Sequence, residues 1–205
     1  SLMTGRYGIR TRQQPDGPPR GIWYGLTSWE ITLAEMLSDA GYATGMFGKW
    51  HLGDAEGRYP TDQGFDEWYG IPNSSDQAFW PDSDSFQKDA GVEFTRVMTS
   101  IRNQKPKKHE VYGRVKRATI DREITDYALE FIARRAETKK PFFVYLPYTQ
   151  THEPVDAHPD FKGSTGNGSF ADVLAQTDSY VGELIARIDD LGIKDNTIFI
   201  FTSDN

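Results

Sequence analysis

The chain has 205 residues, a formal net charge of −7, and 37% hydrophobic and 13% aromatic residues, a composition typical of a globular domain with a core. The acidic balance argues against nucleic acid as the main partner, and the densest basic run, at 105–109, is interpreted as a solvated loop. No apolar stretch approaches the roughly 20 residues of a membrane span. The lack of cysteine excludes disulfides and a cysteine nucleophile within these residues.

The first half of the chain is predicted to contain one helix and one strand before a long loop region. Thr27 precedes Glu30 by three residues, which is the spacing of a capping box, and apolar residues at helical spacing follow until Gly41 ends the helix. A short strand is expected at 42–48. Residues 54–113 are rich in Gly, Pro, Asp, Ser and aromatic residues without a clean hydrophobic period, so they are predicted to be long ordered loops.

The second half alternates helices with apolar strands. Apolar stripes predict helices at 117–138 and 169–191, and apolar runs of strand length predict buried strands at 141–148 and 197–204. This alternation predicts an α/β fold with a mostly parallel central sheet flanked by helices. We expect one partial domain over 1–205, truncated at both ends, because the chain starts without Met and stops directly after its last strand.

Polar clusters follow three of the predicted strands. Lys49 and His51 follow the first strand, His152 follows the second, and Asp204 with Asn205 follow the last. In an extended backbone, residues two apart point the same way, so Lys49 and His51 are expected to share one face. Because the carboxyl ends of parallel strands meet at one edge of the sheet, we expect all five side chains to lie in one crevice there.

Simpler interpretations exist for two of these clusters. Asp204 and Asn205 after a strand fit a turn whose side chains bond their own backbone, and His152 near Pro154 fits a loop histidine packed on a proline. Lys49 is harder to explain in this way, because a lysine close to a core needs a specific reason to be there. The residues alone leave both interpretations open.

The chemistry of the five side chains is complementary. Lys49, His51 and His152 form a set of cationic hydrogen-bond donors, whereas Asp204 and Asn205 offer the hard oxygen ligands that Ca²⁺ or Mg²⁺ prefers. A cationic cradle beside a metal suits an anion that gains charge in the transition state, such as a sulfuryl or phosphoryl group. Lys49 would neutralise the oxygens of that group, and a histidine would protonate the departing alcohol. These residues include no nucleophile for such a reaction.

The first residues carry a resemblance that supplies one. "LMTGR", at 2–6, resembles the second half of the sulfatase signature, in which Cys/Ser-x-Pro-x-Arg and two variable residues precede Leu-x-Thr-Gly-Arg. That match puts the nucleophile six residues ahead of Ser1. Further segments resemble the later blocks of the family in family order: "GYATGMFGKWHLG", "GFDEWYGIPNSSDQ", "FFVYLPYTQTHEPV" and "NTIFIFTSDN". The chain is identified as a member of the sulfatase family, within the alkaline-phosphatase-like fold.

The resemblance implies roles for individual residues. A sulfatase hydrolyses a sulfate monoester with a formylglycine made from the signature Cys or Ser. By resemblance, Lys49 contacts the sulfate oxygens, and His51 supports the formylglycine hydroxyl and helps to break down the sulfated enzyme. His152 reaches the ester oxygen or the sulfate, and Ser74 hydrogen-bonds the sulfate.

The resemblance also implies cofactors, partners and a setting. Asp204 and Asn205 become two ligands of a calcium ion, with magnesium as an alternative, and the partner is a small-molecule or saccharide sulfate ester. The family resemblance favours a periplasmic, secreted or lysosomal protein. With the nucleophile outside the chain, we expect residues 1–205 alone to be inactive and to bind calcium weakly. Two alternatives remain: a phosphonate or phosphate ester hydrolase of the same superfold, or a catalytically silent binding module.

Overall fold

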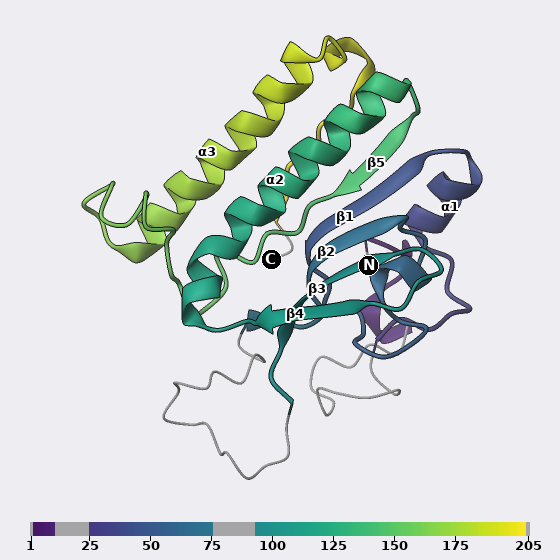
Figure 1. Cartoon of the computed structure of the whole chain (residues 1–205), viewed down its shortest axis with the longest axis horizontal. Helices are drawn as coiled ribbons and strands as arrows, with labels where there is room; N and C mark the ends of the chain where they lie inside the picture. Colours follow the sequence, from purple (N-terminus) through teal and green to yellow (C-terminus); the bar gives the residue numbers. More distant parts are fainter. Residues whose placement is uncertain (1, 11–24, 76–92, 204–205) are drawn as a thin grey trace.

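The computed structural model describes residues 2–10, 25–75 and 93–203, which are arranged around a five-stranded sheet (Figure 1). The sheet has the order β4-β3-β2-β1-β5. Its strands are β1 (Ala43–Lys49), β2 (Glu67–Ile71), β3 (Arg96–Ile101), β4 (Lys107–Val111) and β5 (Phe142–Tyr145). β1 pairs in parallel with both β2 and β5, whereas β3 is antiparallel to both of its neighbours. The predicted α/β class is confirmed, and the sheet is mixed, with its parallel pairs on one side.

The prediction of a long loop region over 54–113 is wrong, because β2, β3 and β4 all lie within it. These strands are short and each of the three pairs antiparallel to a neighbour, so pairing with distant residues decides their conformation rather than a local hydrophobic period. β4 shows this most clearly, since its first four residues are exposed and only Val111 is half-buried. A strand without an apolar face gives no periodic signal.

In the described part of the chain three α-helices flank the sheet, at the places where helices were predicted. They are α1 (Leu33–Asp39), α2 (Arg114–Thr138) and α3 (Ser169–Asp190), and 3₁₀ turns occur at Gly8–Arg10, Pro60–Asp62 and Lys194–Asn196. α2 and α3 lie side by side on one side of the sheet, and α1 lies at the opposite side (Figure 1). None of the helices in the described part of the chain combines the length and apolar character that crossing a bilayer requires.

Two clusters of buried side chains pack between the sheet and its helices. Alternate residues of a strand point to opposite faces, so neighbouring side chains enter different clusters: Phe47 packs with α2, and Met46 packs toward α1. Tyr69 and Trp68 divide in the same way. The other buried members of the α2 cluster are Ala43, Ile71, Val97, Tyr112, Ile120, Ile124, Ala128, Phe131, Ile132, Leu184 and Ile188, and those of the α1 cluster are Met3, Ala34, Trp50, Phe65 and Met98. The carboxyl ends of β1, β2 and β5 are thereby held in fixed relative positions.

The cap of α1 is not the predicted one. The sequence contains two Thr-x-x-Glu patterns in succession, and the structure uses the second. Thr32 Oγ1 accepts a hydrogen bond from Glu35 N at 3.0 Å, and the Glu35 carboxylate accepts one from Thr32 N at 2.7 Å. The Thr32 hydroxyl also donates to the Gln63 carbonyl at 2.7 Å, which ties the helix start to the loop before β2.

Removing this cap should destabilise the fold measurably. We expect Thr32→Ala to lower the free energy of unfolding by about 1–2 kcal/mol, the usual effect of losing an N-cap side chain. Urea denaturation of the wild type and the variant measures the difference. Thr27→Ala is the matched control, because Thr27 Oγ1 has no hydrogen-bond partner among the described residues. Equal losses in the two variants would contradict the assigned cap.

The last predicted strand does not form within the described residues. Residues 197–203 have no strand assignment, and the side chains of Ile198 and Ile200 are 89% and 79% exposed. Phe201 is exposed as well, as is Leu174 on α3. The apolar run has the composition of a core strand, but a strand is buried only when other elements cover it, and among the described residues β5 ends the sheet with β1 as its sole neighbour.

Candidate active site

The end of β1 is tied to the loops that follow β5 and β2. Lys49, the last residue of β1, donates its backbone N–H to the Pro147 carbonyl at 2.9 Å. His51 donates its backbone N–H to the Pro72 carbonyl, also at 2.9 Å. These bonds continue the parallel pairing past the sheet, so the segments carrying Lys49, His51 and the residues after Pro72 and Pro147 form one edge.

Two glycines allow this close approach. A Cβ atom at Gly48 would lie 2.0 Å from the Pro147 carbonyl oxygen, and one at Gly70 would lie 1.9 Å from the Gly48 oxygen. Gly48 also has a φ of +137°, in the region where residues with a Cβ are strained. Any side chain at either position would separate the strand ends directly beside Lys49.

His51 has an unusual backbone conformation. Its φ is 55°, in the left-handed region that few non-glycine residues adopt. The expected extended geometry is therefore wrong at this residue: β1 ends at Lys49, and the left-handed turn redirects the chain. The neighbouring Trp50 fixes the turn, since its ring is buried and its Nε1–H donates to the Arg58 carbonyl at 2.8 Å. Strained residues of this kind concentrate at functional sites.

Ser74 lies at the same edge, three residues after the end of β2. Its side chain is 1% exposed, and its Oγ has no hydrogen-bond partner among the described residues. The next residue, Ser75, is different because its Oγ bonds the Tyr112 hydroxyl at 3.0 Å. A buried hydroxyl without a protein partner is available for a ligand oxygen.

His152 lies on the loop after β5 and is exposed. Its Nδ1 is 2.8 Å from the Glu153 carbonyl oxygen. A carbonyl oxygen can only accept, so Nδ1 carries the hydrogen and Nε2 is the atom that exchanges a proton. The ring is thus set in the tautomer that a proton-transferring histidine needs.

The loop after β5, which carries His152, is held by hydrogen bonds from a buried arginine on α2. Arg117 on α2 is fully buried, and its guanidinium donates to Thr149 Oγ1 and to the Thr149 carbonyl at 2.9 Å. It also donates to Gln150 Oε1 at 2.9 Å, the His152 carbonyl at 2.7 Å and the Pro154 carbonyl at 3.2 Å. Five acceptors from one short loop therefore converge on one side chain.

Asp121, one helical turn further along α2, completes the support. Its Oδ1 accepts from Thr149 N at 3.0 Å and from Thr149 Oγ1 at 2.7 Å, and its Oδ2 accepts from Gln150 N at 3.1 Å. Burial raises the pKa of the Asp121 carboxyl, and the Arg117 charge and these hydrogen bonds oppose the shift. The sequence did not reveal this pair. The signal for it in the sequence is that Arg117 and Asp121 fall at helical spacing on the same face as the apolar stripe that contains Ile120.

Four of the predicted site residues come to one edge of the sheet. Lys49 is the last residue of β1, and His51, Ser74 and His152 follow the carboxyl ends of β1, β2 and β5 in turn. The backbone pairing thus brings the segments that carry them to the same edge, and a crevice formed by their side chains stays a prediction. Their chemical roles stay predictions, because hydrogen-bond geometry alone does not assign them.

The predicted metal ligands, Asp204 and Asn205, lie outside the described residues. Within the described ranges, no group of three or more His, Cys, Asp or Glu side chains is arranged to hold a metal ion. Calcium takes 6–8 oxygen ligands. Asp204 and Asn205 therefore stay predicted calcium ligands.

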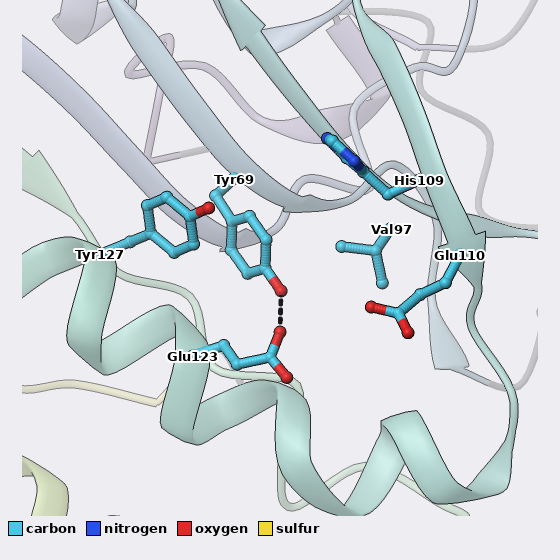
Figure 2. A pocket seen from close by; sticks show the side chains of 6 residues that line it. All are labelled: Tyr69, Val97, His109, Glu110, Glu123 and Tyr127. Atoms are coloured by element: carbon cyan, nitrogen blue, oxygen red, sulfur yellow. Dashed lines mark hydrogen bonds between the residues drawn. The ribbon is translucent and has the colours of Figure 1, made fainter.

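A cavity of about 200 Å³ lies elsewhere, between α2 and strands β2 to β4 (Figure 2). Figure 2 shows Tyr69 pointing at Glu123, to which its hydroxyl donates a hydrogen bond, with Glu110 across the cavity. Lys116 pairs with both carboxylates, at 2.8 Å from Glu110 and 2.6 Å from Glu123, so one net negative charge remains at the cavity. Burial and Glu123 raise the pKa of Tyr69, so it stays a donor at neutral pH. Two carboxylates would repel a sulfate, so this cavity is not a sulfate site.

Comparison with known proteins agrees with the motifs. The sequence model of the family described as "Sulfatase" matches residues 1–205. N-acetylgalactosamine-6-sulfatase of Canis lupus familiaris is 32% identical over 212 residues, and arylsulfatase A of Homo sapiens is 34% identical over 217 residues. Each alignment covers 100% of this chain, which spans 40% of the first relative and 41% of the second.

Solved structures show the same architecture. The PsFucS1 sulfatase from Pseudoalteromonas sp. superposes with a TM-score of 0.79 at 25% identity, covering 93% of this chain and 41% of that one. Ps i-CgsB in complex with k-i-k-neocarrahexaose gives a TM-score of 0.72 at 27% identity, covering 93% of this chain and 43% of that one. A family match over every residue, together with the sheet edge that carries Lys49 and His51, establishes that the chain belongs to the sulfatase family.

Proposed function

We propose that the protein containing these residues hydrolyses sulfate monoesters. The observation that carries the proposal is the convergence of Lys49, His51, Ser74 and His152 on one sheet edge, in a chain that matches the sulfatase family from residue 1 to residue 205. All four side chains can donate hydrogen bonds when the histidines are protonated. An edge of donors suits the oxygens of a sulfate group.

Each side chain has a distinct task in this proposal. The Lys49 ammonium attracts the non-bridging sulfate oxygens and the negative charge that builds up as the ester bond breaks. The Ser74 hydroxyl donates to a sulfate oxygen and so fixes the orientation of the group. Protonated His152 gives the hydrogen on Nε2 to the departing alcohol oxygen, which would otherwise leave as a costly alkoxide.

Two further components belong to the proposal by family resemblance. A formylglycine, formed from a Cys or Ser ahead of Ser1, supplies the nucleophile when it is present. His51 would hold and relay the proton of that nucleophile. Asp204 and Asn205 are proposed as two oxygen ligands of calcium, and the rest of its ligand shell must come from other parts of the protein.

The substrate class is proposed to be a sulfated saccharide. Support comes from the relatives, since one is named N-acetylgalactosamine-6-sulfatase, and from a solved neighbour in complex with k-i-k-neocarrahexaose. A periplasmic, lysosomal or extracellular setting is the proposed location, by the same family resemblance.

Comparative kinetics on the full-length protein test the reaction class. We expect turnover of 4-nitrophenyl sulfate to exceed that of 4-nitrophenyl phosphate and of an aryl phosphonate monoester, because the chain matches the sulfatase family over residues 1–205. Each rate is followed by the release of 4-nitrophenol. Preference for the phosphorus esters would instead identify a phosphate or phosphonate hydrolase, and no turnover of any ester would identify a silent binding module.

A further inference from the structure

We propose that Asp54 and Asn73 form an acceptor pair, whose side-chain oxygens accept hydrogen bonds from donors on the alcohol half of the substrate. The inference rests on the proposed sulfatase function and deepens it, because it assigns two residues to substrate selection. Neither residue was among the site residues predicted from the sequence.

The pair lies beside the sulfate-binding edge. Asp54 follows the end of β1 by five residues, and Asn73 follows the end of β2 by two. Asn73 Nδ2 donates to Asp54 Oδ2 at 3.1 Å, and the backbone bond from His51 to Pro72 joins the same two segments. In the sequence, Asn73 directly precedes Ser74, and Asp54 lies three residues after His51.

Each residue of the pair has one side-chain oxygen without a hydrogen-bond partner among the described residues. Asn73 is 3% exposed, and its Oδ1 is buried without a hydrogen-bond partner among the described residues. The same holds for Asp54 Oδ1. The amide orientation is fixed by its partner, because a flipped amide would place two acceptor oxygens against each other. Two adjacent acceptors thus stand unpaired at a binding edge, where burial makes an unmet hydrogen bond costly.

The turn that carries Asp54 is rigidly held. The Tyr59 hydroxyl donates to the Asp54 carbonyl at 2.7 Å, and burial, with Asp54 and other carboxylates nearby, raises the pKa of Tyr59 to about 12. Arg58 donates to the carbonyls of Gly25 and Leu26 at 2.8 and 3.0 Å. The acceptors are therefore held in place before a ligand arrives, which lowers the entropy cost of binding.

The polarity of the pair decides what it can bind. Sulfate oxygens are acceptors and carry negative charge, so a carboxylate and an amide oxygen repel them. Hydroxyl and N–H groups are donors and would satisfy both oxygens. The edge thus has a donor part at Lys49 and Ser74 for the sulfate, and an acceptor part for an alcohol rich in hydroxyl or N–H groups. The alcohol half of a saccharide sulfate has these groups, whereas that of a simple aryl sulfate has no hydroxyl or N–H donor.

The test is a cycle of protein and substrate changes in the full-length protein. The substrates are 4-nitrophenyl sulfate, a panel of hexose and hexosamine O-sulfates, and deoxy analogues of the best saccharide, each lacking one hydroxyl. Asp54→Asn keeps the shape and the bond to Asn73 but presents an N–H donor where the free acceptor stood. We expect it to lower the ratio of kcat/KM for the saccharide sulfate over the aryl sulfate by about 10- to 100-fold, the usual effect of losing a hydrogen bond to a charged acceptor.

Two measurements keep the outcome decisive. Wild-type protein alone should lose a similar factor with one of the deoxy analogues, a result that needs no variant to fold, and Asp54→Asn should no longer distinguish that analogue. Ser75→Ala is the matched control: Ser75 lies in the same buried loop but is paired with Tyr112, so the substrate ratio should stay within about twofold.

Results that contradict these expectations distinguish a failure of the acceptor pair from a failure of the proposed sulfatase function. Turnover of the aryl sulfate with no saccharide sulfate accepted, or an unchanged ratio in Asp54→Asn, would overturn the acceptor pair and leave the sulfatase function intact. An unchanged ratio would mean that a bound water, rather than substrate, satisfies the two oxygens. Turnover of neither ester would overturn the proposed function and the inference together.

Discussion

Lys49→Ala in the full-length protein should reduce kcat for a sulfate ester by about 10²–10³-fold, which is the usual effect of removing one donor aimed at transition-state charge. The stability of the fold should change far less, because Lys49 is at the end of β1 and is held there through its backbone bond to Pro147. Initial rates with 4-nitrophenyl sulfate and urea denaturation of the same samples measure the two effects separately.

Lys116→Ala is the matched control for this result. Lys116 is also a largely buried lysine, but it bridges Glu110 and Glu123 at the other cavity. Its loss should affect stability and leave kcat of the folded protein within about threefold, since it lies away from the β1 edge. Near wild-type turnover in Lys49→Ala would show that the proposed sulfate contact is wrong.

Arg117→Ala should have the largest effect on stability, lowering the free energy of unfolding by about 3–5 kcal/mol, as expected when one member of a buried charged network is removed. The substitution leaves the loop carbonyls of Thr149, His152 and Pro154 without their donor and leaves Asp121 without its balancing charge. Urea denaturation followed by tryptophan fluorescence measures the loss.

Arg122→Ala supplies the comparison on the same helix. Arg122 is half-buried and pairs with Asp126 and Glu183, each at 2.7–2.8 Å, on the outer side of the helix. Surface pairs of this kind contribute about 0.2–1 kcal/mol. Arg117→Lys should fall between the two alanine variants, since lysine keeps the charge but offers three donors where arginine offers five. Similar losses in Arg117→Ala and Arg122→Ala would contradict the role of Arg117 as the support of the His152 loop.

The edge that carries Lys49 and His51 was predictable because its signals are local. A short apolar strand followed by Lys49, His51 and closely spaced glycines is visible in the sequence, and the parallel pairing of β1 with β2 and β5 then brings Ser74 and His152 to the same side. Helices α2 and α3 were predictable for a similar reason, since each carries buried apolar residues at helical spacing over several turns.

What the sequence did not reveal depends on distant partners. β4 has an exposed face and forms because β3 lies beside it. Arg117 and Asp121 look like ordinary helix charges until the loop at Thr149 supplies their partners. The Asp54–Asn73 pair joins residues from two different turns. In each case the deciding interaction crosses the chain, and no window of neighbouring residues contains it.

The β5 edge of the sheet and the exposed apolar residues at 198–201 affect how the protein behaves in solution. Among the described residues β5 is the last strand of the sheet, an edge position at which another chain can pair, and the exposed side chains of Ile198, Ile200 and Phe201 add apolar surface. The net charge of −7 keeps copies apart at low ionic strength. At about 0.15 M salt that repulsion is screened beyond roughly 8 Å, so residues 1–205 handled alone become more prone to self-association as salt is added, and dilute, low-salt buffers keep them monodisperse.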